Sequence, residues 1–162
     1  TKINAGDARV SGMEFNVRNS LAFDGNCGRQ FQAFVNGTKL ELKGNSEADW
    51  RGFVPESLNW GLSFSRRPFT VMAQWRYQGE SQKAPVATMG TNAYTFRQAR
   101  TSMDLNVEYL FRARFSVFAN VRNVFNEYFT DWVYGPQTPE YAKFRVDNNN
   151  GTQFAIGVKG TF

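Results

Sequence analysis

A strict alternation of apolar and other residues runs through most of this chain and limits the structures that it can form. The clearest runs cover residues 58–66, 69–78, 102–111, 115–122 and 154–162. Nearly every second residue in each run is apolar, as with Leu58, Trp60 and Leu62 in the first. A period of two places successive side chains on opposite faces of a β-strand, whereas a helix needs apolar residues three and four apart. The five runs therefore predict β-strands with one apolar face.

Two further strands with a weaker pattern are predicted near the start of the chain. Their apolar residues are Met13, Phe15, Val17 and Leu21 in residues 10–21, and Phe31, Ala33 and Val35 in residues 30–42. The second run loses its alternation near Gly37. Together, the runs predict an all-β chain with about seven strands.

The connections between the predicted strands alternate between short and long. Residues 66–68 and 112–114 are minimal turns, whereas residues 43–57, 79–101 and 126–151 are long and polar. In an up-and-down antiparallel barrel, short turns gather at one rim and long loops at the other. The alternation therefore favours this topology.

Matching the apolar faces of neighbouring strands also limits their register. Because apolar residues must share a face, Trp60 is expected to lie opposite Trp75 or Tyr77. In the next hairpin, both apolar sets have odd numbers, so the turn needs an odd number of residues or a bulge. The three residues 112–114 meet this condition and predict that Phe111 lies opposite Phe115.

The composition excludes several kinds of chemistry within this chain. It contains no histidine and a single cysteine, Cys27, which rules out a Ser-His-Asp triad, a Cys-His dyad and an internal disulfide. Zinc sites of the usual nitrogen and sulfur kind are equally excluded. The net charge is +5, but the basic residues are scattered and form no run, so nucleic-acid binding is not expected. No enzymatic activity, cofactor or metal is expected, and the polar first residues predict no signal peptide at this point.

Three features favour a membrane over a soluble core as the environment of the apolar face. Large aromatic residues lie toward strand ends, where barrels carry interfacial girdles, namely Trp60, Trp75, Tyr77, Phe111, Phe115 and Tyr128. The opposite face carries charges and amides in mid-strand, and Phe162 ends the last strand on its apolar face. A soluble or adhesive β-barrel binding module, in which the apolar stripe is the core, remains an alternative.

Several segments resemble those of TonB-dependent outer-membrane receptors. Residues 118–128 (Phe-Ala-Asn-Val-Arg-Asn-Val-Phe-Asn-Glu-Tyr) are similar to the segment that closes the next-to-last strand of that family. Residues 4–14 and 55–60 are similar to two earlier strand segments, in the expected order. Residues 154–162 resemble the terminal strand that marks outer-membrane barrels for assembly, with Gly157 and Phe162 fitting the pattern and Gly160 departing from it. Asn123 and Asn126 are also expected simply to satisfy backbone groups where strand pairing stops.

The resemblance implies a transmembrane barrel of about 22 strands closed around an N-terminal plug domain. Residues 1–162 are then the C-terminal portion of that barrel, without the plug or the TonB box, and are expected to be a fragment. The implied function is uptake of a scarce nutrient, such as a siderophore, vitamin or glycan, across the outer membrane of a Gram-negative-type bacterium. The implied partners are outer-membrane lipid, the plug domain, the TonB complex and the β-barrel assembly machinery. A porin-like channel that does not use TonB is an alternative.

Candidate working residues follow from this arrangement. The charged residues of the polar face are expected to face the lumen and contact the plug, namely Glu14, Arg18, Arg76, Asp104, Glu108 and Arg122. The aromatic residues of the last long loop are expected to contact a ligand, namely Trp132, Tyr134 and Tyr141. The arginines of the two short turns are interpreted as solvated turn residues.

Overall fold

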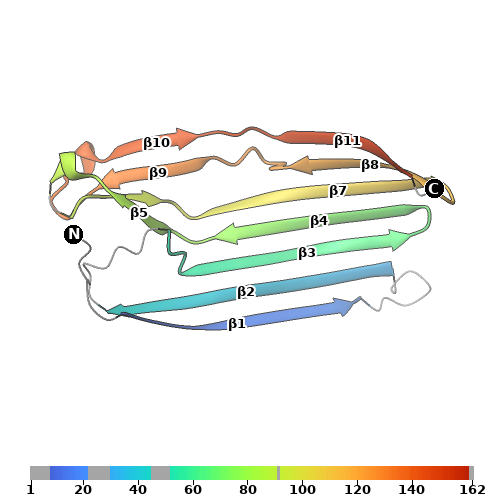
Figure 1. Cartoon of the computed structure of the whole chain (residues 1–162), viewed down its shortest axis with the longest axis horizontal. Coiled ribbons are helices and arrows are strands. Elements are labelled where there is room, and N and C mark those ends of the chain that lie inside the picture. Colours follow the sequence, from blue (N-terminus) through green and yellow to red (C-terminus); the bar gives the residue numbers. More distant parts are fainter. Residues whose placement is uncertain (1–7, 22–29, 45–51, 91, 161–162) are drawn as a thin grey trace.

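The computed structural model describes residues 8–21, 30–44, 52–90 and 92–160, which form two antiparallel sheets (Figure 1). The larger sheet has seven strands in the order β1-β2-β3-β4-β7-β8-β11. These are β1 (Ala8–Ser20), β2 (Phe31–Gly44), β3 (Glu56–Arg66), β4 (Phe69–Gln78), β7 (Arg100–Arg112), β8 (Phe115–Arg122) and β11 (Gln153–Gly160). All seven predicted strands are present, and the all-β prediction is confirmed.

The smaller sheet was not predicted and lies within segments that were expected to be loops. Its order is β10-β9-β6-β5, with β5 (Ser81–Pro85), β6 (Tyr94–Arg97), β9 (Phe129–Tyr134) and β10 (Phe144–Asn148). Figure 1 shows β9 and β10 continuing the lines of β8 and β11 beyond a short interruption. Two single-turn 3-10 helices, η2 (Ala87–Met89) and η3 (Glu140–Ala142), lie in the remaining connections.

The registers place the alternating apolar residues of all seven long strands on one face, whereas Val10, Leu40 and Leu42 of β1 and β2 lie on the other face. Directly opposed residues in antiparallel strands point to the same side of the sheet. The apolar face of one strand is therefore on the same side as that of the strand it pairs with. The chain of pairs is Val17–Val35, Val35–Trp60, Trp60–Trp75, Trp75–Met103, Leu105–Val121 and Val121–Phe154. Of the two partners expected for Trp60, Trp75 is the one that lies opposite it, and the two rings stack with centroids 6.3 Å apart.

The turn between β7 and β8 follows the second of the two solutions expected for it. Leu110 pairs with Ser116, but the register then shifts and Arg112 pairs with Phe115. The expected pairing of Phe111 with Phe115 is therefore wrong, because Phe111 is taken up in the bulge. The two rings still stack with centroids 6.1 Å apart, so the bulge keeps the apolar faces of both strands together.

Two aromatic residues on the polar face break the alternation, and glycines on neighbouring strands explain them. Phe34 pairs with Gly61, and a Cβ at Gly61 would lie 2.5 Å from the Phe34 ring. Phe118 pairs with Gly157, where an added Cβ would meet its ring at the same distance. Each ring thus covers the gap that a glycine leaves in the adjacent strand.

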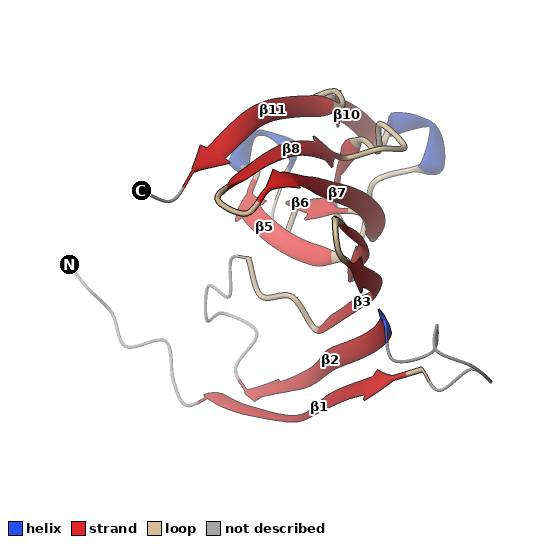
Figure 2. Cartoon of the chain, turned by 90° about the vertical axis from the view of Figure 1, so that its right-hand side faces the viewer, coloured by secondary structure: helices blue, strands red, loops and turns tan. Residues whose placement is uncertain are grey.

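The sheets enclose almost no hydrophobic core. Figure 2 shows the long strands following one another in a single curved layer. Of the hydrophobic residues that the structure describes, only Ala93 is buried. Large apolar side chains are exposed instead, with Met13 and Ile156 both nearly four-fifths accessible at 78% and 79%. Among the described residues, no helix has the length and apolar character needed to cross a membrane.

The end of β8 is organised around Asn123, the central residue of the segment that resembles the receptor family. Asn123 and Asn126 have positive φ angles of 53° and 54°, which asparagine tolerates better than most residues. The Asn123 side chain donates to the carbonyls of Glu127 and Gly151 and accepts from the Glu127 N–H. The expectation that Asn123 satisfies backbone groups where pairing stops is confirmed. The Asn126 side-chain oxygen is buried without a partner, so that residue contributes through its backbone conformation.

Candidate functional site

The six charged residues expected to face a lumen all lie on the polar face of the larger sheet. The registers place Glu14 opposite Thr38, Arg76 opposite Ser102 and Glu108 opposite Thr70, away from the apolar set. Asp104 lies opposite Gln74, Arg18 opposite Phe34 and Arg122 opposite Gln153. Their shared face is confirmed, whereas their contact with a plug domain stays a prediction.

These charged residues do not form one continuous network. Glu108 accepts hydrogen bonds from Ser116 at 2.6 Å and from Lys159 at 2.8 Å, near the short turns. Arg76 lies 3.9 Å from Asp104, whose other oxygen accepts from the Asn123 N–H. Lys159 was not predicted, because a lone lysine in a terminal strand gives no signal until its neighbour is known.

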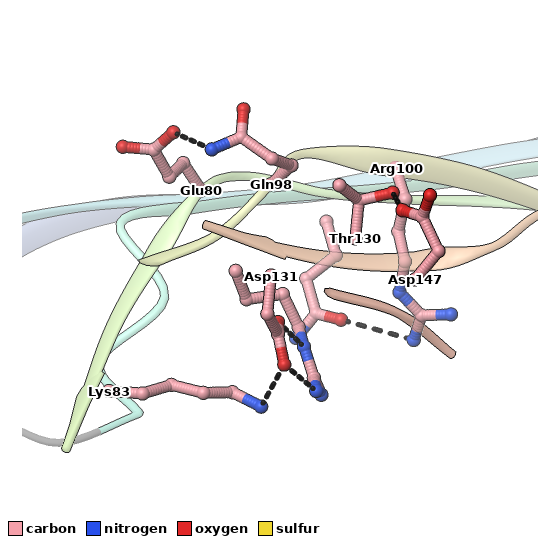
Figure 3. A network of polar contacts seen from close by, with 9 residues as sticks. Glu80, Lys83, Gln98, Arg100, Thr130, Asp131 and Asp147 are labelled. Carbon is pink, nitrogen blue, oxygen red and sulfur yellow. Dashed lines mark hydrogen bonds and ion pairs between the residues drawn. The ribbon is translucent and has the colours of Figure 1, made fainter. Parts of the chain in front are cut away.

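A second polar cluster lies on the smaller sheet (Figure 3). Arg97 on β6 pairs directly with Asp131 on β9, and its guanidinium donates to both carboxylate oxygens at 2.9 and 3.0 Å. Lys83 on β5 lies 3.6 Å from the same carboxylate. Asp131 is buried, with 9% of the residue exposed, and the hydrogen bonds from Arg97 lower the pKa of its carboxyl group despite that burial. Asp131 is therefore an anion that holds two cations from neighbouring strands.

Arg100 connects this cluster to the polar face of the larger sheet. Its guanidinium lies over the ring of Phe129 at 3.7 Å from the centroid, and that of Arg97 lies 5.0 Å from the same centroid. Arg100 also pairs with Gln78 and donates to its side chain at 3.4 Å. In Figure 3, the Arg100 guanidinium points to the same side of the strands as Asp131 and Lys83. The polar face of the larger sheet thus continues onto the face of the smaller sheet that carries Asp131.

The opposite face of the smaller sheet carries two of the three predicted ligand residues. Trp132 and Tyr134 lie there together with Phe96, whose ring stacks on that of Tyr134 with centroids 4.5 Å apart. They line part of a shallow cavity of about 280 Å³, whose remaining lining residues are Glu80, Gln98, Glu140 and Lys143. Trp132 and Tyr134 therefore point away from the Asp131 cluster.

The third predicted ligand residue, Tyr141, lies in η3, is 90% exposed and is not among the residues that line this cavity. The basic residues beside the aromatic face are each paired with an acid. Lys143 lies 2.7 Å from Glu140, which raises the pKa of the lysine, and Arg145 lies 3.0 Å from Asp147. Both cations on this face are therefore neutralised, and Glu80 is a further carboxylate there that accepts a hydrogen bond from Gln98.

Sequence reasoning did not identify Lys83, Arg97, Arg100 or Asp131, because all four lie in segments taken for loops, residues 79–101 and 126–151. Residues 129–134 (Phe-Thr-Asp-Trp-Val-Tyr) are rich in the β-branched and aromatic residues that strands favour, but they do not alternate as the longer strands do. The four short strands have only four to six residues each, too few for a periodic pattern to stand out.

The predicted insertion signal is only partly within the described residues. Gly157 lies in β11 under the ring of Phe118, which gives this glycine a packing role as well. Phe162, Cys27 and residues 4–7 of the first resembling segment lie outside the described residues.

No group of three or more His, Cys, Asp or Glu side chains suited to a metal ion occurs in the described part of the chain. Comparisons of the chain with family models, with curated proteins and with solved structures found no match.

Proposed function

We propose that this chain is part of the transmembrane barrel of an outer-membrane transporter of the TonB-dependent type, which takes up a scarce nutrient. The single observation that carries the membrane assignment is the continuous apolar face of a sheet that has almost no core. A soluble barrel would bury that stripe in its interior. Here only Ala93 is buried among the described hydrophobic residues, and a lipid environment accounts for the exposure of the others.

The distribution of aromatic residues along the strands supports the same proposal. Near the short turns, Phe69 lies against Tyr109 with ring centroids 4.9 Å apart, and Phe31 lies against Phe64 at 4.7 Å. The other group, farther along the same face, includes Tyr77, whose hydroxyl donates to Glu56 at 2.8 Å. A Tyr at a membrane interface keeps its ring in the apolar region and its hydroxyl among polar groups in this way.

The separation of these two groups fits the thickness of an outer membrane. Phe69 and Tyr77 begin and nearly end β4 and lie on its apolar face. Eight residues of strand extend about 26 Å, which a tilt of about 40° reduces to about 20 Å across the membrane. The apolar band of outer-membrane barrels is roughly 25 Å tall. The residues between the two groups are mainly aliphatic, such as Val71 and Ala73.

The transporter part of the proposal rests on the resemblance of residues 118–128 to the receptor family. The hydrogen bonds of Asn123 give this segment a structural role, because they close the end of β8. The same residues at another strand end would serve that role without any relation to the family. The open edges of the sheet at β1 and β11 support a larger barrel, because unpaired backbone groups are costly in lipid.

The orientation of the apolar face can be tested in the full-length protein that contains this chain, reconstituted in lipid vesicles. Single fluorophores are attached to cysteines introduced into a cysteine-free background. The apolar-face positions are Leu62, Val107 and Ile156, and the polar-face positions are Ser63, Asn106 and Ala155. Ala155 is used instead of Gly157 because the Phe118 ring leaves no room at Gly157.

We expect a lipid-soluble quencher to reduce fluorescence at the first three positions and an aqueous quencher to act on the second three. Shielding of the first three from both quenchers, in a protein that stays soluble without detergent, would show that the stripe is a core. Planar-bilayer recordings then separate the two kinds of channel. A plugged transporter should show little conductance as purified, whereas a steady open conductance would contradict the TonB-dependent type and favour a porin.

A further inference from the structure

We propose that an anionic group, a carboxylate or phosphate, binds where the polar faces of the two sheets meet, through Arg100 of β7 with Arg97 and Lys83 of the smaller sheet beside it. This inference deepens the proposed function by giving the charge class of the transported ligand. It also moves the expected ligand contacts from Trp132 and Tyr134 to the opposite face of the sheet.

Arg100 has donor groups that the protein leaves largely unused. A guanidinium carries five N–H donors. Within the described part of the chain, the one hydrogen bond of the Arg100 side chain is the contact with Gln78, which is long at 3.4 Å. Its Nε is buried without a partner. The Phe129 ring holds the guanidinium in place, so the group is positioned before any ligand arrives.

Arg97 and Lys83 are also held in position, through Asp131. The carboxylate accepts hydrogen bonds from Nε and Nη2 of Arg97 and lies 3.6 Å from the ammonium group of Lys83. Both side chains stay partly accessible, with 26% of the Arg97 and 31% of the Lys83 side chain exposed. Two partly accessible cations therefore lie on the same face as Arg100, fixed by one buried anion.

The local charges are not balanced. Arg100 interacts electrostatically with two other cations, Arg97 and Arg76, and with one carboxylate, Glu127. Arg76 pairs with Asp104, and Arg97 and Lys83 both pair with Asp131. The set around Arg100 therefore has four cations and three carboxylates. One anionic group would balance this set, and arginine binds carboxylates and phosphates with two parallel hydrogen bonds. The aromatic face of the smaller sheet has no such excess, because Lys143 and Arg145 are each paired.

The test uses the full-length protein in detergent micelles and inorganic phosphate as the probe, with binding measured by equilibrium dialysis of radiolabelled phosphate. Tetramethylammonium of similar size serves as the cation control. The test variant is Arg100→Gln. The matched control is Arg145→Gln, which removes one positive charge from the face of the smaller sheet that carries Trp132. Arg100→Lys is the second variant, since it keeps the charge and loses the planar group.

We expect saturable phosphate binding that Arg100→Gln weakens about tenfold or more, as expected for hydrogen bonds to a charged group. Arg145→Gln should bind like the original protein, Arg100→Lys should lie between the two, and tetramethylammonium should not compete. If Arg100→Gln does not fold, the Arg100→Lys result decides in its place. Equal phosphate binding by the Arg100 variants and Arg145→Gln, or no saturable binding by the folded original protein, would overturn the proposal and leave the cluster as a clamp between strands.

The labelling experiment and the phosphate experiment fail independently. Phosphate binding that depends on Arg100 in a protein whose apolar stripe proves to be a core would refute the membrane assignment and leave the anion site standing. The expected quenching pattern without phosphate binding would leave the membrane assignment standing and refute the anion site.

Discussion

Replacement of Asn123 should destabilise the sheet more than replacement of any polar residue on an open strand face, and by an amount that depends on the substitute. Asn123 has φ 53° and ends β8. Its side chain makes three hydrogen bonds, two with Glu127 and one with Gly151, of 2.9 to 3.3 Å. These bonds connect the end of β8 with the segment that precedes β11.

The magnitude follows from these contacts and from the backbone. A typical intramolecular hydrogen bond contributes about 0.5–1.5 kcal/mol, so the loss of three costs about 2–4 kcal/mol. Asn123→Gly loses the bonds but adopts a positive φ without penalty. Asn123→Ala loses the same bonds and adds about 1–2 kcal/mol for placing a Cβ in the left-handed region. Alanine should therefore be the more destabilising substitute by that difference.

Urea unfolding of the full-length protein in lipid vesicles, followed by tryptophan fluorescence, measures these differences. Asn120→Ala is the matched control, because Asn120 lies on the polar face of the same strand, opposite Asn106 and Ala155. Its effect should stay within about 1 kcal/mol, as for surface substitutions away from special features. Equal losses for Asn123→Ala and Asn123→Gly would refute the backbone argument, and a loss no greater than that of Asn120→Ala would refute the hydrogen-bond argument as well.

Three further predictions concern the two faces and the smaller sheet. Leu105→Arg should cost about 2–4 kcal/mol of folding free energy in vesicles if its face meets lipid, whereas Gln74→Arg on the polar face should cost less than about 1 kcal/mol; equal costs in refolding titrations would contradict the assignment of faces. Gly157→Leu should lower the yield of folded protein on semi-native gels, because its Cβ would meet the Phe118 ring, and an unchanged yield would show that the ring moves aside freely. Arg97 lowers the pKa of Asp131, so the stabilisation is complete above about pH 4 and is lost as the pH falls through the lower folded pKa. Hydrogen exchange of the β9 amides should therefore accelerate in acid, and Asp131→Asn should remove that acceleration; an acceleration that persists in Asp131→Asn would assign it to another carboxylate.

The long strands could be predicted because the polarity of each side chain matches the face of the sheet on which it lies. An apolar residue at every second position, as around Trp60 and Trp75, reveals both the strand and the face that meets its neighbour. The same rule failed at Phe34 and Phe118, whose rings cover glycines on adjacent strands. Such residues can be interpreted only when the register is known.

The Asp131 cluster could not be predicted for a related reason. Arg97 and Asp131 are 34 positions apart, and nothing in either local segment identifies the other as its partner. Their contact depends on β6 and β9 pairing in one register, and both strands are too short for a periodic pattern to reveal them in the sequence. The lumen candidates were easier, because their common face follows from the alternation alone, whereas their pairing partners, such as Lys159 for Glu108, do not.

The order of strands in the larger sheet has a consequence for how the chain folds. Each long strand pairs with the next long strand along the sequence, from β1 to β11, and none crosses over another. Each pairing therefore has to close only the connection between two successive long strands, and none depends on a strand from a more distant part of the chain. The sheet can therefore grow by one hairpin at a time in either direction. At every stage, the newest strand presents a free edge that templates the next one and that, if growth stalls, pairs with another chain instead.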